Sequence, residues 1–319
     1  MEGAAPKPFA STADTAQQEA MLEELAPGVF AFTAQGDPNV GAVVGPESVL
    51  CVDARSTPAA AGDWLEVLRR VTEKPVEWLV LTHYHAVRVL GASAFRARHV
   101  VSHERTRSWI RERGQQDFES ELRRFPRLFR DVESVPGLTF PDLTFADRLT
   151  LVLGEQEVDL RWLGGGHTLG DACVWLPGER VLFAGDLVEA RAAPYAGDAA
   201  IEAWATTTLD AARALGAETL VPGRGPAVRG DEVDVTIAET REYLRALWDS
   251  VRVVREDGGG LKDAADRART ELEPRFGDWW IFEHCFPFNV ARAYDEASGL
   301  EAQVWTAEKD AELWHELQG

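Results

Sequence analysis

The chain has 319 residues, of which 45% are hydrophobic, so it is long enough to bury a sizeable core. Its formal net charge of −20 argues against nucleic acid or an anionic membrane as the main partner, because both would repel such a surface. No apolar stretch approaches the roughly 20 residues that span a bilayer, and the N-terminus lacks a basic start followed by an apolar run. We expect a cytoplasmic protein that acts on a small molecule.

The three cysteines, Cys51, Cys173 and Cys285, all lie in apolar surroundings. Their number is odd, and an isolated cysteine in such a setting is usually a small buried side chain in a reducing compartment. We therefore expect free thiols and no disulfide.

Short apolar runs alternate with turn signals through the first half of the chain. The runs VFAFTA, GAVVG and VLCVD predict strands, a helix follows over about 58–72, and VEWLVLTH predicts the next strand. Later strands are predicted at RLTLVLG, EVDLRWLG, ACVWLPG and RVLFAGD, then a helix over 201–215 and a strand at TLVPG. Two groups of strands with helices between them indicate an α/β protein in which sheets are sandwiched between helical layers.

A helical insertion is predicted over about 103–140, and it is rich in arginine for so acidic a chain. Its arginines are Arg105, Arg107, Arg111, Arg113, Arg123, Arg124, Arg127 and Arg130. We expect them to pair at helical spacing with Glu104, Glu112, Glu119 and Glu121. In the alternative, this segment is a lid that steers anions toward a site.

The chain from residue 231 to 319 is helical in period throughout. We therefore expect three parts: an N-terminal segment over 1–26, a domain over 27–230 that carries the strands, and a helical C-terminal region over 231–319.

Residues that suit a metal follow three of the predicted strands. His83 and His85 come after WLVLT, and because alternate residues of an extended chain point to one side, both imidazoles face the same way. His167 follows a later strand in LGGGHTLGD, and Asp186 ends FAGD. Three neutral imidazoles with an open coordination position are the usual donor set of a catalytic zinc.

These segments together resemble the metallo-β-lactamase superfamily. The landmarks PGVFAF, NVGAVVG, VLCVDA, THYH, GHTLGD, FAGD and VPGRGP occur in the order of that family along residues 27–230. The resemblance implies an α/β fold of the αββα type, here with a helical C-terminal extension. We expect Asp53, which ends VLCVD, to support the ligand loops through backbone hydrogen bonds and not to bind metal.

The sequence departs from the family pattern at the second metal position. In the family motif HxHxDH, His83 and His85 match the first two histidines, but Val87 stands in place of the aspartate and Arg88 in place of the last histidine. Arg224, in VPGRGP, stands where the family has its final histidine. The ligands of the first position are all present, and Asp186 matches the carboxylate that normally bridges two metals.

These residues suggest a hydrolase with a mononuclear zinc site on His83, His85 and His167, with Asp186 as a further ligand or as the group that orients the attacking water. Arg88 and Arg224 would bind an anionic substrate and stabilise the tetrahedral intermediate. The substrate class is a small anionic ester, thioester, lactone or amide.

Two other readings stay open. In one, Arg88 and Arg224 only pair with Asp186, and the protein is a metal-free binding module. In the other, the chain is similar to persulfide dioxygenases of the same superfamily, which bind one Fe2+ through two histidines and an aspartate; His83, His167 and Asp186 occupy those places.

His284, in the aromatic segment WWIFEHCFPFN, is a further candidate for substrate binding if the C-terminal helices fold over the site. In similar hydrolases of this superfamily an added helical domain helps to bind substrate. The C-terminal region is expected to act in that way or to cover a homodimer interface with exposed tryptophans.

Overall fold

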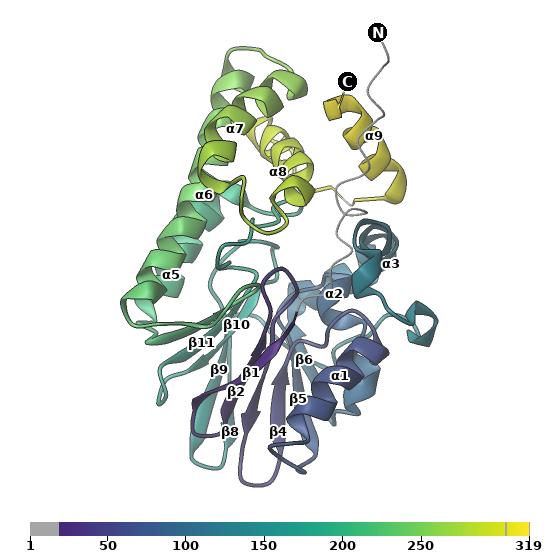
Figure 1. Ribbon diagram of the computed structural model, residues 1–319, viewed down its shortest axis with the longest axis vertical. Helices are drawn as coiled ribbons and strands as arrows, with labels where there is room; N and C mark the ends of the chain where they lie inside the picture. The colour runs from purple at the N-terminus through teal and green to yellow at the C-terminus, as the bar shows by residue number, and fades with distance from the viewer. Residues whose placement is uncertain (1–18, 304, 319) are drawn as a thin grey trace.

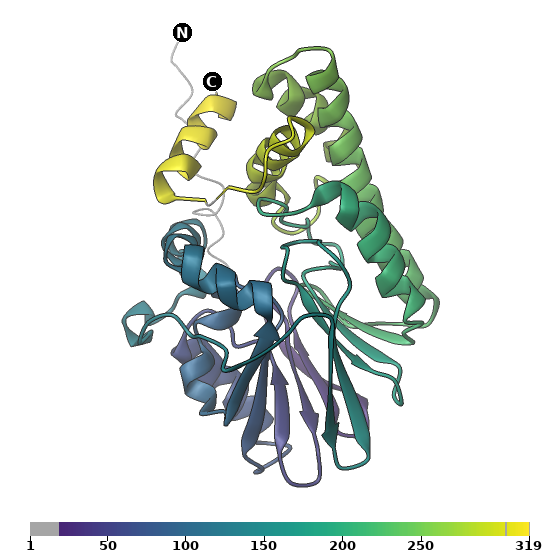
Figure 2. The ribbon, with the colours of Figure 1, turned by 180° about the vertical axis from the view of Figure 1, so that it is seen from behind.

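The computed structural model describes residues 19–303 and 305–318. Two β-sheets pack face to face and helices cover the outer face of each, as Figures 1 and 2 show. The expected αββα sandwich is confirmed, and a group of helices follows it in the chain.

The first sheet has the strand order β1-β2-β3-β4-β5-β6-β7. Its strands are β1 (Met21–Ala26), β2 (Val29–Thr33), β3 (Val40–Val44), β4 (Val49–Val52), β5 (Val76–Leu81), β6 (His99–His103) and β7 (Leu143–Phe145). The pairs up to β3–β4 are antiparallel, and those from β4 to β7 are parallel.

The second sheet has the order β13-β12-β11-β10-β9-β8. Its strands are β8 (Arg148–Leu153), β9 (Gln156–Trp162), β10 (Ala172–Leu176), β11 (Val181–Gly185), β12 (Thr219–Pro222) and β13 (Val228–Arg229). Only β11 and β12 run parallel to each other.

The helices of the described residues are α1 (Pro58–Leu68), α2 (Ala86–Val89), α3 (Glu104–Arg124), α4 (Ile201–Ala203), α5 (Leu209–Ala214), α6 (Asp231–Glu256), α7 (Leu261–Phe276), α8 (Phe282–Ala297) and α9 (Ala307–Gln318). Short 3-10 turns follow α2 and α3, at Ala92–Phe95, Pro126–Leu128 and Val132–Ser134. A π-helical stretch, Trp204–Thr208, joins α4 to α5, so the helix expected over 201–215 is present with one widened segment.

Alternate residues of the central strands face different cores. In β10, Val174 and Leu176 lie in the core between the two sheets, whereas Cys173 and Trp175 lie in the core shared with the C-terminal helices. A third core lies between the first sheet and the helices α1 to α3, and it includes Trp64. Burial on both faces explains why these strands read as continuous apolar runs. All three cysteines are buried and free, as expected.

The division of the chain at residues 26/27 and 230/231 stays a prediction. β1 pairs with β2 in antiparallel register, so residues 21–26 form an edge strand of the first sheet, and residues 1–18 lie outside the described part of the chain. Among the described residues, no helix combines the length and apolar character needed to cross a membrane.

The expected pairing within the arginine-rich segment is wrong for at least four of its arginines. Arg113 lies 3.7 Å from Asp198 and Arg124 lies 3.9 Å from Asp310. Arg127 and Arg130 pair with Asp37 and Asp63. The reason is that this segment packs on other elements, so its cations meet carboxylates from distant parts of the chain. The alternative role as a lid stays a prediction.

The C-terminal helix α9 lies beside α3 in both views (Figures 1 and 2). Asp310 of α9 is fully buried and accepts a hydrogen bond of 2.6 Å from the Ser120 hydroxyl of α3. Of the tryptophans expected at a dimer surface, Trp279 and Trp305 are buried and Trp280 is 42% exposed. The homodimer stays a prediction.

Candidate metal centre

The candidate ligands lie where strands of both sheets end. β5 ends at Leu81, just before His83 and His85, and β11 ends at Gly185, just before Asp186. His167 lies in the glycine-rich loop between β9 and β10, in which a side chain on Gly166 would come within 2.4 Å of Leu187. The loops therefore meet at one edge of the sandwich, as the positions of the motifs predict.

The structure brings the three histidines together. One ring nitrogen from each of His83, His85 and His167 lies within 4.8 Å of the other two, and all three side chains are buried. The rings meet edge to face, with centroids 4.6 to 4.9 Å apart. Such spacing suits a common metal ion at the usual Zn–N distance of about 2.0–2.1 Å.

The outer nitrogen of each ring has an acceptor. His83 Nδ1 lies 3.0 Å from the Thr82 hydroxyl, whose own hydrogen is donated to Asp53. His85 Nε2 lies 2.9 Å from Asp198 Oδ2, and His167 Nδ1 lies 2.7 Å from a backbone carbonyl. These partners assign the ring protons to the outer nitrogens, as in metal-binding histidines generally.

The inner nitrogens then carry lone pairs that face one another. His85 Nδ1 lies 2.9 Å from His167 Nε2, and His83 Nε2 makes no hydrogen bond with any described residue. Buried acceptors without a donor are costly, so this arrangement requires a cation or a proton at its centre. The donor set thus fits a metal ion such as zinc.

Burial and nearby carboxylates act on these imidazoles in opposite directions. Burial lowers the pKa of His83 well below its usual value and that of His167 to about 3. Burial also acts to lower the pKa of His85, but the carboxylates of Asp117, Asp198 and Glu121 outweigh it and raise that pKa to about 9. His85 is therefore the ring on which a proton would compete with a metal.

Asp186 faces the histidines but is held by arginines. Its Oδ2 lies 3.7 Å from both His83 Nε2 and His167 Nε2. Arg88 donates to its Oδ1, and Arg224 donates to Oδ2 at 3.1 Å. Burial would raise the pKa of Asp186, but the two guanidinium groups outweigh it and hold that pKa well below the usual range, so the side chain is a carboxylate at neutral pH.

Both arginines are buried and make several hydrogen bonds in this region. Arg88, 1% exposed, also donates to the carbonyls of Asn39 and Gly223, and Arg224 donates to Glu189 at 2.9 Å. A Cβ on Gly223 would lie 2.4 Å from Asp186 Oδ1, so the absence of a side chain there is what lets the backbone approach the carboxylate. Substrate binding by Arg88 and Arg224 stays a prediction. Their pairing with Asp186 is the arrangement expected of a metal-free binding module.

Asp53 behaves as the sequence indicated. It accepts hydrogen bonds from the Thr82 backbone N–H at 2.8 Å and from the Thr82 hydroxyl at 2.9 Å, and lies 3.4 Å from Arg88. It therefore holds the loop that carries His83. Burial raises the pKa of Asp53 to about 6, against the opposing charge of Arg88.

His284 of α8 is buried, and its ring centroid lies 3.8 Å from that of Phe125. Burial, aided by the charges of Arg124 and Arg224, lowers the pKa of His284 well below its usual value, so the imidazole is neutral. Its role in binding substrate stays a prediction.

Sequence reasoning missed the carboxylates that support the histidine loop. Asp198 bonds to His85 and also accepts from the Tyr84 hydroxyl at 2.6 Å. Asp117 and Glu121 of α3 accept the backbone N–H groups that begin α2, at Ala86 and Val87. Their spacing in α3, four residues apart on one helix face, was the available signal, because a buried face with two acids needs donors from a neighbour.

Comparisons with known proteins agree with this geometry. The family model described as the metallo-beta-lactamase superfamily matches residues 34–224, which is more than half of the chain. The metallo-beta-lactamase type 2 of Bacteroides fragilis is 32% identical over 121 residues, which cover 36% of this chain and 48% of that enzyme. The match therefore spans about half the length of this relative. The corresponding enzyme of Bacillus cereus is 25% identical over 201 residues, 61% of this chain and 70% of the relative.

Solved structures share the fold. A metallo-beta-lactamase from Pontibacter korlensis aligns with a TM-score of 0.57 at 22% identity, covering 71% of this chain and 99% of that one. FIM-1 from Pseudomonas aeruginosa, solved in a mono-zinc form, aligns with a TM-score of 0.54 at 20% identity over 70% of this chain and 95% of that one. On the family match, the order of the strand-end motifs and the convergence of three histidines, this chain belongs to the metallo-beta-lactamase superfamily.

Proposed function

We propose that this protein is a metal-dependent hydrolase that holds one zinc ion through His83, His85 and His167 and acts on a small anionic ester, thioester, lactone or amide. The observation that carries the proposal is the set of three inward lone pairs, each fixed by an outer hydrogen bond. Membership of a superfamily whose curated relatives are named metallo-beta-lactamases supports a hydrolase.

Zinc bound by three imidazoles supplies a water acidified to a pKa of about 7, and hence a nucleophile at neutral pH. The protein's own residues do the rest of the work in this proposal. Asp186, ionised because Arg88 and Arg224 flank it, lies where it can orient the water, and the same two arginines make it a weak proton acceptor because they lower its pKa. Asp198 keeps the His85 ring in the tautomer that offers Nδ1 inward.

Arg88 and Arg224 are proposed to stabilise negative charge at the site. Two permanent cations stand where a second divalent ion would otherwise contribute two positive charges. Both already bind Asp186, so an anionic substrate would have to share these donors with that carboxylate or replace it. His284 is proposed as a neutral contact to the substrate from the C-terminal helices.

An iron oxygenase is the second candidate. Asp186 Oδ2 lies at the same distance, 3.7 Å, from His83 Nε2 and His167 Nε2, which is the grouping that a facial triad of two histidines and one carboxylate needs. A metal-free binding protein is the third candidate, supported by the ion pairs that both arginines make with Asp186.

Elemental analysis of protein purified without added metal separates the three candidates. About one zinc per chain supports the hydrolase, whereas iron accompanied by oxygen consumption supports the oxygenase. Absence of metal together with unchanged folding supports the binding module. His167→Ala should lose the metal, because it removes one of three ligands.

Hydrolysis is then measured on a panel of carboxylate-bearing esters, thioesters, lactones and β-lactams, the last because curated relatives carry that name. Arg224→Lys keeps the charge but removes the planar fork, so it should raise KM for the anionic substrates while zinc stays bound. If turnover and KM are unchanged in Arg224→Lys, Arg224 has no role in binding the substrate.

The proposal includes a cytoplasmic setting, which the three free buried thiols support.

A further inference from the structure

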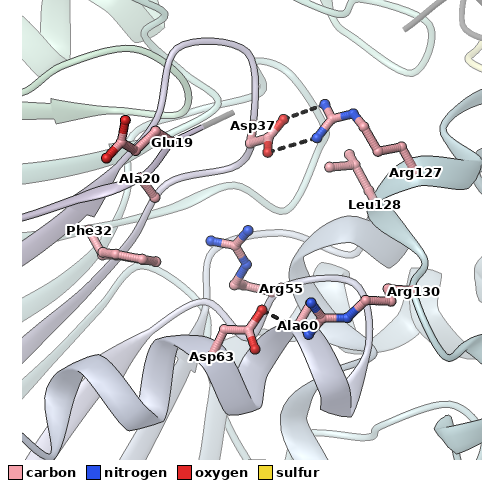
Figure 3. Close-up of a pocket in the computed structure, with 10 residues that line it drawn as sticks. All are labelled: Glu19, Ala20, Phe32, Asp37, Arg55, Ala60, Asp63, Arg127, Leu128 and Arg130. Atoms are coloured by element: carbon pink, nitrogen blue, oxygen red, sulfur yellow. Dashed lines mark hydrogen bonds and ion pairs between the residues drawn. The ribbon is translucent and has the colours of Figure 1, made fainter. Parts of the chain in front are cut away.

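A cavity of about 300 Å3 lies beside the start of α1, and none of its lining residues belongs to the metal centre (Figure 3). Its charged lining comes from the loop between β2 and β3 with Asp37, the first turns of α1 with Asp63, the segment after α3 with Arg127 and Arg130, the loop after β4 with Arg55, and Glu19 just before β1. Its volume is at the lower end of the range of pockets that bind small molecules.

Two of the three arginines that line the cavity are matched by carboxylates. Arg127 donates to both oxygens of Asp37, at 2.6 and 3.0 Å, and Arg130 donates to Asp63 at 2.8 Å. Figure 3 draws both contacts as dashed lines. The third carboxylate of the lining, Glu19, is exposed and makes no ion pair with the third arginine, so that arginine has no carboxylate partner among the described residues.

That third arginine is Arg55, and its guanidinium makes no hydrogen bond or ion pair with any residue in the described ranges 19–303 and 305–318. It is half-buried and lies 5.8 Å over the ring of Phe32, in the space between the Asp37 pair and Asp63 (Figure 3). Burial lowers the pKa of this guanidinium and outweighs the opposing charges of Asp37 and Asp63. A desolvated cation without a partner is unfavourable, and a bound anion would remove that cost.

The backbone holds Arg55 in a fixed place. Its φ is +61°, a left-handed conformation that non-glycine residues rarely adopt unless neighbours impose it. Gly91 donates its N–H to the Arg55 carbonyl at 3.0 Å, and Ala54 donates its N–H to the Arg88 carbonyl at 2.7 Å. The side chain is thus presented to the cavity from a rigid loop.

We propose that this cavity binds a small organic acid through its carboxylate, at a site separate from the metal centre. One guanidinium fork matches one carboxylate in charge and in geometry. Phe32 and Leu128 offer apolar surface for the remainder of such a molecule. A dianion such as phosphate fits less well, because Asp37 and Asp63 already place negative charge at the rim.

The proposal is tested by titrating the full chain with sodium benzoate in a calorimeter, once with EDTA and once without it. We expect saturable binding at one site per chain in both conditions, and weaker binding of inorganic phosphate. Arg55→Gln should lower the affinity for benzoate about 10-fold or more, the usual effect of losing a charged hydrogen-bond donor. The matched control Arg98→Gln, an exposed arginine whose nearest carboxylate oxygen is 3.8 Å away on Glu77, should bind as the parent does.

Arg55→Lys keeps the charge and removes the fork, so it should give an intermediate affinity even if Arg55→Gln unfolds. The proposal is overturned by the absence of saturable binding to the parent chain, by equal affinity in Arg55→Lys and the parent, or by phosphate binding as tightly as benzoate. Benzoate binding that disappears in His167→Ala would place the anion at the metal centre and would equally overturn it. None of these results depends on whether the metal centre hydrolyses a substrate.

Discussion

The two halves of the buried polar centre are built from similar strand-end loops, yet their chemistry is opposite. In the half with His83, His85 and His167, the inner ring nitrogens face one another and need a cation or a proton between them. In the half with Arg88 and Arg224, each guanidinium already bonds to a carboxylate. The first half needs a cation from outside, whereas the second half carries its own.

The half with Arg88 and Arg224 contains side chains of both charges. Arg88 and Arg224 bring two positive charges, and Asp53, Asp186 and Glu189 bring up to three negative charges. A side chain cannot be exchanged or removed by a chelator, so this half has the same charge in metal-free and metal-loaded protein. The comparison predicts that the arginine half supports the fold and that the histidine half responds to metal.

Removing an arginine from the half with Arg88 and Arg224 should have the largest effect on the free energy of unfolding. Arg88→Met leaves the buried Asp186 carboxylate without its main partner, and removing one member of a buried ion pair costs about 3–5 kcal/mol of the free energy of unfolding. Urea unfolding in EDTA measures this cost. The double variant Arg88→Met with Asp186→Asn should recover part of it, and Arg98→Met, on the surface, should cost less than about 0.5 kcal/mol.

Filling the histidine half should stabilise the fold by a smaller and adjustable amount. A ligand present at about 100 times its Kd adds about 2.7 kcal/mol to the free energy of unfolding. Zinc should therefore raise the Tm of the parent chain and leave the Tm of His167→Ala unchanged. An equal rise in both proteins would show that zinc binds elsewhere.

Loosening the support of one ligand should have a smaller effect still. Asp198→Asn weakens the hydrogen bond that orients His85, and loss of such a partner typically costs 10- to 100-fold in metal affinity. Competition with a chromophoric chelator measures the affinity. Tyr84→Phe is the matched control, because it removes the other donor to Asp198 and leaves the bond to His85 in place.

A further prediction concerns the pH dependence of stability. Burial and the charge of Asp186 raise the pKa of Glu189 to about 8 from a usual value of 4.5, against the opposing charge of Arg224. A carboxyl whose pKa is raised in the folded state contributes stability below its unfolded pKa and loses that contribution as the pH rises through the folded value. The free energy of unfolding of the parent should therefore fall relative to that of Glu189→Gln between pH 5 and pH 8. An unchanged difference would mean that Glu189 is ionised throughout this range.

The sequence predicted the sandwich and the histidine half because both depend on local pattern. The runs VLCVD, WLVLTH and VLFAGD each end in a motif residue, and strands that end at one edge bring such residues together. Asp198 was missed because it lies in an irregular loop, where no periodicity marks a residue that will reach a distant ring. The partner of Arg113 was missed for the opposite reason: helical spacing points to residues three or four positions away, but this face of α3 is buried against other elements.

The close approach of Gly223 to Asp186 has a consequence for variation of the chain. A library of all twenty residues at position 223, screened for soluble expression, should retain glycine almost alone, since even alanine would place a methyl group on a carboxylate oxygen. Gly178, where an added Cβ would meet nothing within 4 Å, should accept most substitutions in the same screen.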